Sequence, residues 1–277
     1  MSALEILSPT AREPLLDVQG LGKYFSLGGG SLFGRDKTRI KAVDDVSFSI
    51  WPGETLALVG ESGSGKTTCD RAVARLYRPD AGTIRFKGID ITRLSTRALR
   101  PLRRGFQMMF QDPFDSLDPR QTIGAIITEP LVIHDWKNPT ERRERCAEVM
   151  AMVGLNPADV TRYPHEFSGG QRQRIATARA LITRPDLIVA DEPVSALDVS
   201  VRAQVLNLLR DLAETQNVTF VMISHDLAVV DYICQDIVVL YGGKIVEAGP
   251  AAEILRRPRH DYTKALIAAA TRRPRPG

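Results

Sequence analysis

Short runs of apolar and β-branched residues alternate with longer helical patterns along this chain, an order typical of a parallel sheet covered by helices. Residues 55–60 (TLALVG), 187–191 (LIVAD) and 218–224 (VTFVMIS) are largely apolar, and we predict that they form buried central strands. Residues 46–50 (VSFSI) instead alternate apolar and serine positions, which predicts an antiparallel strand covered on one side. The pattern predicts an α/β fold with a mainly parallel core sheet and an antiparallel β subdomain.

The strand pattern stops between about residues 122 and 163, where segments such as TERRERCAEVMAMVGL are helical and charged. We therefore predict a helical subdomain, about residues 112–180, inserted into the α/β core. Beyond it, GKIVEAG (243–249) predicts one more strand, and PAAEILRR and YTKALIAAA predict two helices.

The predicted organisation is a main domain over residues 13–250, followed by a short C-terminal extension over residues 251–277. A Gly-rich stretch near the start, SLGGGSLFGRD (26–36), predicts a loop between two early strands.

Residues 60–67 (GESGSGKT) match G-x-x-x-x-G-K-[ST], and they lie between a predicted strand and a predicted helix, KTTCDRAVARLY. Glycines at such a turn let backbone N–H groups converge on phosphate oxygens, and the helix adds the positive end of its dipole. Lys66 is expected to reach the β- and γ-phosphates, while Thr67 offers a hydroxyl to Mg²⁺. The predicted ATP contacts are Gly60, Glu61, Ser62, Gly63, Ser64, Gly65, Lys66, Thr67 and Thr68.

Two adjacent acids, Asp191 and Glu192, end the apolar run LIVADEP. Acids at a strand end also serve as helix-capping groups, but a phosphate-binding loop earlier in the chain favours a catalytic pair. In that setting Asp191 orders Mg²⁺ through water, and Glu192 is the candidate to polarise the attacking water.

A second stretch, FSGGQRQR (167–174), has the composition of another anion-binding helix start. Ser168 is a good N-cap, Gly169 and Gly170 leave backbone N–H groups unshielded, and QRQRIATARALI continues as a helix. A well-capped ordinary helix would look the same, so the stretch alone does not decide between the two.

Taken together, the phosphate loop, LIVADEP and FSGGQRQR resemble the motifs of ATP-binding cassette (ABC) ATPases, the motor subunits of ABC transporters, over about residues 15–270. The resemblance implies a P-loop NTPase fold with ABC architecture and an inserted helical signature subdomain. Two cassettes pack head to tail in this family. Its signature residues bind the partner's γ-phosphate, and here they are Ser168, Gly169, Gly170 and Gln171.

Four further roles follow from the same resemblance. MMFQDP resembles the glutamine loop, in which Gln111 contacts Mg²⁺ and the water and senses the membrane partner. ISHD resembles the switch region and places His225 against the γ-phosphate. Phe25 in LGKYF matches the aromatic that stacks on adenine, with Tyr24 as the alternative. SALD resembles the D-loop, formed by Ser195, Ala196, Leu197 and Asp198.

Sequence details resemble the ATPase subunits of bacterial dipeptide, oligopeptide and nickel importers, and the long early loop resembles the F-type member of their ATPase pairs. Such a subunit works with a second cassette, identical or different, with two membrane permeases and with an extracytoplasmic solute-binding protein. One departure is Asp261, which stands between His260 and Tyr262 where this branch usually has proline.

Composition fits this expectation. Net charge is only +4, and the C-terminal arginines lack interleaved aromatics, so we expect no nucleic-acid partner. These basic residues predict a solvated helix and tail, with an anionic lipid surface or a partner as the alternative. The three cysteines have no metal-binding or disulfide spacing.

No secretion signal or eighteen-residue apolar run occurs, and we expect a peripheral protein on the cytoplasmic face of the bacterial inner membrane. Alternatives are a soluble ABC ATPase acting on nucleic acid or ribosomes, a scaffold without turnover, and an importer ATPase for nickel, an opine or a sugar.

Overall fold

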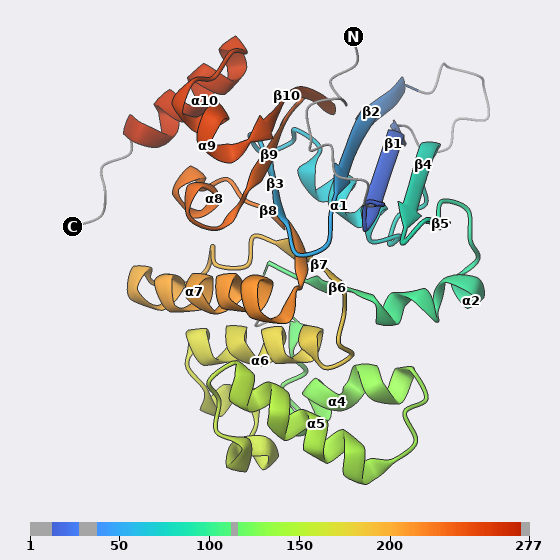
Figure 1. Cartoon of the computed structure of the whole chain (residues 1–277), viewed down its shortest axis with the longest axis vertical. Coiled ribbons are helices and arrows are strands. Elements are labelled where there is room, and N and C mark those ends of the chain that lie inside the picture. Colours follow the sequence, from blue (N-terminus) through green and yellow to red (C-terminus); the bar gives the residue numbers. More distant parts are fainter. Residues whose placement is uncertain (1–12, 28–37, 112–115, 273–277) are drawn as a thin grey trace. The chain divides into compact units, whose positions relative to one another are not determined.

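The apolar runs at the centre of the predicted sheet are strands in the computed structural model, which describes residues 13–27, 38–111 and 116–272 (Figure 1). The chain divides into two units. Unit one consists of the residues up to Leu94 and those from Ile223 onward, and unit two is Ser95–Met222. The Gly-rich loop predicted at residues 26–36 lies mostly outside the described residues.

Unit one contains an antiparallel sheet with the strand order β2-β1-β4-β5. The predicted alternation in VSFSI is confirmed, because Val46, Phe48 and Ile50 are buried and the two serines between them are half-buried. The strands are β1 (Leu16–Leu27), β2 (Thr38–Ile50), β4 (Ala81–Phe86) and β5 (Ile89–Asp90).

A second set of strands in unit one leads to the phosphate loop. Strand β3 (Thr55–Val59) is buried throughout and pairs in parallel with β9 (Asp236–Tyr241), which pairs antiparallel with β10 (Lys244–Pro250). Helix α1 (Lys66–Val73) follows β3, and α8 (Leu227–Ile233) precedes β9. The C-terminal extension forms α9 (Ala251–Arg256) and α10 (Asp261–Arg272), both of which contact β10.

Helix α1 is shorter than the run KTTCDRAVARLY predicts. It ends at Val73, and Arg75 adopts a left-handed backbone conformation with φ of 54°. The buried Arg75 side chain donates to the carbonyl oxygens of Ile91 and Leu94, at 2.8 and 3.1 Å. These tertiary hydrogen bonds accompany a helix end that local propensity does not indicate.

Unit two has its own parallel strands. Strand β6 (Phe106–Met109) pairs in parallel with β7 (Leu187–Asp191), so that Met109 lies opposite Ala190. Strand β8 (Thr219–Ile223), whose last residue returns the chain to unit one, lies next to β7. As predicted, β7 and β8 are buried along their whole length.

The predicted helical segment is confirmed in unit two, where α4, α5 and α6 pack against one another and α6 also contacts α7 (Figure 1). Buried Arg145 of α5 ties the last turn of α6 down by donating to the carbonyl oxygens of Leu181 and Ile182. The helices of this unit are α2 (Thr96–Leu99), η2 (Leu102–Arg104), α4 (Ile123–Ile133), α5 (Pro139–Met152), η3 (Pro157–Thr161), η4 (Pro164–Glu166), α6 (Gly169–Leu181) and α7 (Val199–Gln216).

The unusual Asp261 is the first residue of α10, where an acidic side chain suits the positive end of the helix dipole. Proline is also favoured at this position, because its missing N–H would have no partner there. The position therefore accepts either residue. The basic residues of the extension are partly neutralised locally: Arg259 pairs with Glu253 at 2.7 Å and Lys264 with Asp261 at 2.8 Å.

Candidate nucleotide site

The phosphate loop runs from the end of buried strand β3 to the first turn of α1, as predicted. Gly60, Gly63 and Gly65 have φ angles of 151°, 80° and 105°, a region that side chains rarely adopt. A Cβ at Gly65 would collide with the carbonyl oxygen of Ala42, so the loop is closed to larger residues at that position. Glu61, Ser62 and Gly63 are exposed, while Thr67 and Thr68 are half-buried.

Lys66 is folded across the mouth of this loop. Its side chain is buried, and its Nζ donates to the carbonyl oxygens of Gly60 and Glu61, each at 2.7 Å. The ammonium group is therefore held at the centre of the loop, where a triphosphate bound to the surrounding N–H groups would meet a positive charge. Contact of Lys66 with the β- and γ-phosphates stays a prediction.

His225 emerges at the same edge of unit one. The residue before it, Ser224, donates its backbone N–H to the carbonyl oxygen of Leu58 in β3, at 3.3 Å. Strand β3 ends one residue later and opens into the phosphate loop. His225 itself is exposed. His225 follows a buried strand, as expected, and its contact with the γ-phosphate stays a prediction.

Phe25 and Tyr24, the two candidates for stacking on adenine, differ in their contacts and in their exposure. The Tyr24 hydroxyl lies 3.4 Å from an Asp44 carboxylate oxygen, within hydrogen-bond distance. The Phe25 side chain is 39% exposed and meets Tyr77 edge-on, with 5.9 Å between ring centroids. Of the two candidates, Phe25 presents the more open ring.

Unit two brings together two of the predicted catalytic residues. Gln111 follows β6 and Glu192 follows β7, and the parallel pairing of these strands places both residues at the same edge. The Gln111 Nε2 donates to a Glu192 carboxylate oxygen at 3.0 Å. Local sequence indicates a role for each side chain but not this hydrogen bond, because the bond depends on strand pairing across a separation of 81 residues.

The backbone at Glu192 is unusual as well. Its φ of 46° is rare for a residue with a side chain, and such outliers persist where surrounding structure imposes them. The Glu192 carbonyl oxygen accepts from both the N–H and the hydroxyl of Ser195, at 3.2 and 3.1 Å. Ser195 begins the predicted D-loop, which ends at Asp198, the N-cap of α7. Asp191, the last residue of β7, is only 5% exposed.

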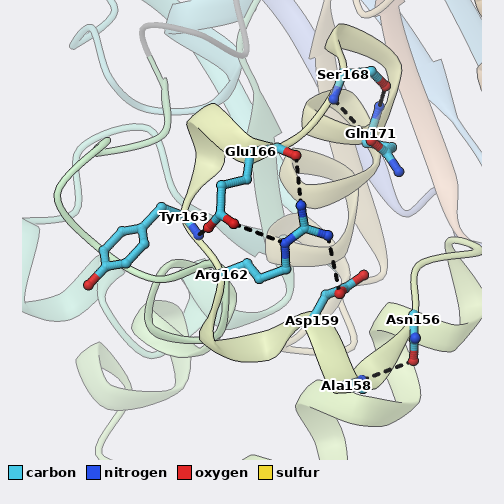
Figure 2. A network of polar contacts seen from close by, with 8 residues as sticks. All are labelled: Asn156, Ala158, Asp159, Arg162, Tyr163, Glu166, Ser168 and Gln171. Carbon is cyan, nitrogen blue, oxygen red and sulfur yellow. Dashed lines mark hydrogen bonds and ion pairs between the residues drawn. The ribbon is translucent and has the colours of Figure 1, made fainter.

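The start of α6 forms the second candidate phosphate site (Figure 2). Ser168 is its N-cap, and Ser168 and Gln171 form a reciprocal capping box: the Ser168 N–H donates to the Gln171 side chain at 3.0 Å and the Gln171 N–H to Ser168 Oγ at 3.3 Å. Ser168 is exposed, and its hydroxyl retains a proton to donate while it accepts from Gln171. A Cβ at Gly170 would collide with Val201 of α7.

Hydrogen bonds around Arg162 fix the chain that leads into this helix (Figure 2). The Arg162 guanidinium binds Asp159 and Glu166 at 3.3 and 3.2 Å, and Glu166 also accepts from the Tyr163 N–H at 2.7 Å. The Tyr163 N–H and Arg162 hold the pKa of the Glu166 carboxyl below its usual value. This ionised network supports the turn before Ser168.

Comparison with known proteins identifies the family of this chain. The family model of the ABC transporter matches residues 43–195, more than half of the chain. This protein is an ABC transporter ATPase. The ABC ATPase is 51% identical over 259 residues to the oligopeptide transport ATP-binding protein AppF of Bacillus subtilis, a match that covers 93% of this chain and 78% of AppF.

Two further comparisons identify a second relative and a solved structure that this ABC ATPase resembles. It is 52% identical over 257 residues to the glutathione import ATP-binding protein GsiA of Salmonella choleraesuis, covering 93% of this chain and 41% of GsiA. Among solved structures it resembles the dimeric ATP-binding cassette MJ0796 bound to ADP and Pi, with a TM-score of 0.74 and 29% identity over 85% of this chain and 98% of that one. Within the described residues of the ABC ATPase, no helix has the length and apolar character needed to span a membrane.

Proposed function

We propose that this ABC ATPase powers the uptake of peptides, or of a related small solute such as glutathione, through two separate permease subunits. The observation that carries the proposal is the 51–52% identity, over 93% of the chain, to proteins named for oligopeptide transport and glutathione import. A solute-binding protein outside the membrane would deliver the solute, and the ATPase would lie on the cytoplasmic face of the inner membrane.

In the proposed site, the phosphate loop binds ATP. Residues 60–68 surround the phosphates, Lys66 contacts the β- and γ-phosphates, and the exposed Phe25 ring stacks on adenine. The residues that would hold Mg²⁺ are Thr67, Gln111 and Asp191, whose hydroxyl, amide and carboxylate oxygens are the kind of donor that this ion prefers. The bound ion would offset charge on the triphosphate.

Hydrolysis in this proposal is carried by Glu192, which accepts a proton from the water that attacks the γ-phosphorus. The Gln111 Nε2 hydrogen bond at 3.0 Å orients the Glu192 carboxylate toward this task. His225 donates a hydrogen bond to the γ-phosphate, and the products are ADP and inorganic phosphate. General base catalysis of this kind contributes about 10²- to 10⁴-fold to the rate.

The second phosphate site of one cassette would complete the ATP site of another cassette. Ser168, Gly169, Gly170 and Gln171 would bind the γ-phosphate of an ATP held by a partner, through the Ser168 hydroxyl and the N–H groups at the helix start. The dimeric form of the MJ0796 cassette supports this arrangement. The partner is a second copy of this chain or a related cassette.

Deletion of the chain from its own cells is expected to abolish uptake of a radiolabelled peptide or of labelled glutathione. The wild-type chain should restore uptake and Lys66→Ala should not, because the alanine cannot hold the phosphates. Uptake assays over a panel of solutes measure this. Unchanged peptide and glutathione uptake, with loss of nickel, opine or sugar uptake instead, would contradict the proposed substrate class.

Replacing Phe25 by alanine is expected to weaken ATP binding by roughly 5- to 150-fold, since stacking on a base contributes about 1–3 kcal/mol. Tyr24→Phe is the matched control, because it removes only the hydroxyl near Asp44. Titration with a fluorescent ATP analogue and with ATP measures both. Equal weakening of ATP and of inorganic triphosphate by Phe25→Ala would argue against an adenine contact.

A further inference from the structure

The C-terminal extension touches the phosphate loop through one tyrosine. The Tyr262 hydroxyl of α10 accepts a hydrogen bond from the backbone N–H of Glu61 at 2.8 Å, across 201 residues of sequence. Its ring packs against that of Tyr241, at the end of β9, with 4.3 Å between centroids. All three residues belong to unit one.

Hydrogen bonds fix the first turn of helix α10, which contains Tyr262. The Glu247 carboxylate of β10 accepts the N–H groups of Arg259 and His260, at 2.8 and 3.1 Å. His260 in turn accepts the Tyr262 N–H on its Nδ1 at 3.1 Å. The backbone around Tyr262 is therefore anchored to the sheet from which the phosphate loop arises, and the hydroxyl has a defined position.

Glu61 is held from its other side by Lys66. While Tyr262 accepts the Glu61 N–H, the Lys66 Nζ donates to the Glu61 carbonyl oxygen and to that of Gly60, each at 2.7 Å. Glu61 of the phosphate loop thus lies between Lys66 of the same loop and Tyr262 of the C-terminal extension. Movement of Glu61 would displace a carbonyl group that positions the Lys66 ammonium.

We propose that Tyr262 is a positioning residue for nucleotide binding, acting through its hydrogen bond to the Glu61 N–H. Gly60, next to Glu61, has a φ of 151° and little intrinsic conformational restraint. Without the Tyr262 hydroxyl, the entrance of the loop samples more conformations, and ATP binding must bear the added entropic cost of ordering it. Turnover at saturating ATP changes little, because Tyr262 holds the loop before ATP binds. This inference rests on the proposed binding of ATP at residues 60–68.

Tyr262→Phe removes the hydroxyl and keeps the ring against Tyr241. A neutral hydrogen bond is worth about 0.5–1.5 kcal/mol, so the variant should raise the Kd and the KM for Mg-ATP by about 2- to 10-fold with kcat within about twofold of wild type. Tyr241→Phe is the matched control: it removes a hydroxyl from the neighbouring ring and should leave the Kd unchanged. Calorimetric titration and steady-state ATPase assays on the full chain measure these values.

Hydrogen exchange tests the contact itself. In nucleotide-free protein, peptides containing Glu61 should exchange faster in Tyr262→Phe than in wild type or in Tyr241→Phe. Unchanged exchange and unchanged Kd in Tyr262→Phe would overturn the inference, as would equal effects of both variants or a fall in kcat alone. Lys66→Ala distinguishes failure of the proposed ATP site from failure of the Tyr262 proposal. If Lys66→Ala binds ATP with the wild-type Kd, the proposed ATP site is wrong. If Lys66→Ala loses ATP and Tyr262→Phe behaves as wild type, only the role of Tyr262 is wrong.

Discussion

Glu192→Gln is expected to lower the rate of ATP hydrolysis by about 10²- to 10⁴-fold, since an amide cannot accept the proton of the attacking water. ATP binding should persist, because the phosphate loop lies elsewhere in the chain and the substituted amide still offers an oxygen to Gln111. ATP that is bound but not hydrolysed should accumulate, and the paired cassettes should remain closed on it. Phosphate release and retention of labelled ATP on the purified protein measure the two effects.

The control for this variant is Glu214→Gln, which makes the same change on the surface of α7, where Glu214 lies 4.0 Å from Arg210. Its ATPase rate should match that of wild type. A Glu192→Gln protein that hydrolyses ATP at the wild-type rate would remove Glu192 from its assigned role and point to Gln111 or His225 instead.

Ser168→Arg is expected to abolish association of cassettes in ATP while leaving ATP bound to the isolated subunit. The Ser168 hydroxyl is proposed to reach the partner's γ-phosphate, and a hydrogen bond to a charged group contributes about 1.5–3 kcal/mol, or roughly 10- to 150-fold in association. The arginine also fills space at the exposed start of α6. The ATPase rate should fall in proportion, as measured together with light scattering and ATP titration.

Gln216→Arg, at the last residue of α7, is the matched control, because it adds the same charge to an exposed helix end in the same unit. It should associate and hydrolyse ATP as wild type does. If Ser168→Arg lost ATP binding in the isolated subunit, the start of α6 would serve the chain's own nucleotide, and the assignment to the partner's ATP would be wrong.

Local sequence predicted the parts of the site that are built locally. The apolar run of β3, the glycines of the loop and the helix at Lys66 are adjacent in the chain, so their order alone indicates a phosphate cradle. The N-cap at Ser168 was predictable for the same reason, since the capping box with Gln171 spans three residues.

Contacts between segments that are distant in the chain could not be predicted from the sequence. The hydrogen bond from Gln111 to Glu192 exists because β6 and β7 pair in parallel, and nothing near either residue encodes that register. The early end of α1 is accompanied by hydrogen bonds from Arg75 to the carbonyl groups of Ile91 and Leu94, which lie outside the helix. The contact of Tyr262 with Glu61 likewise requires the C-terminal helix to return to the phosphate loop.

In the proposed arrangement, each ATP is bound by one cassette and completed by the signature residues of another. Particle mass and bound ATP per subunit are measured in Mg-ATP for Glu192→Gln and for the double variant Glu192→Gln/Ser168→Arg. The partner cassette is added if the chain does not pair with itself. The single variant is expected to form closed pairs, and the double variant is expected to remain unpaired with ATP still bound. Pairs that persist in the double variant, or ATP lost from it, would show that the signature residues do not complete the site of the partner's ATP.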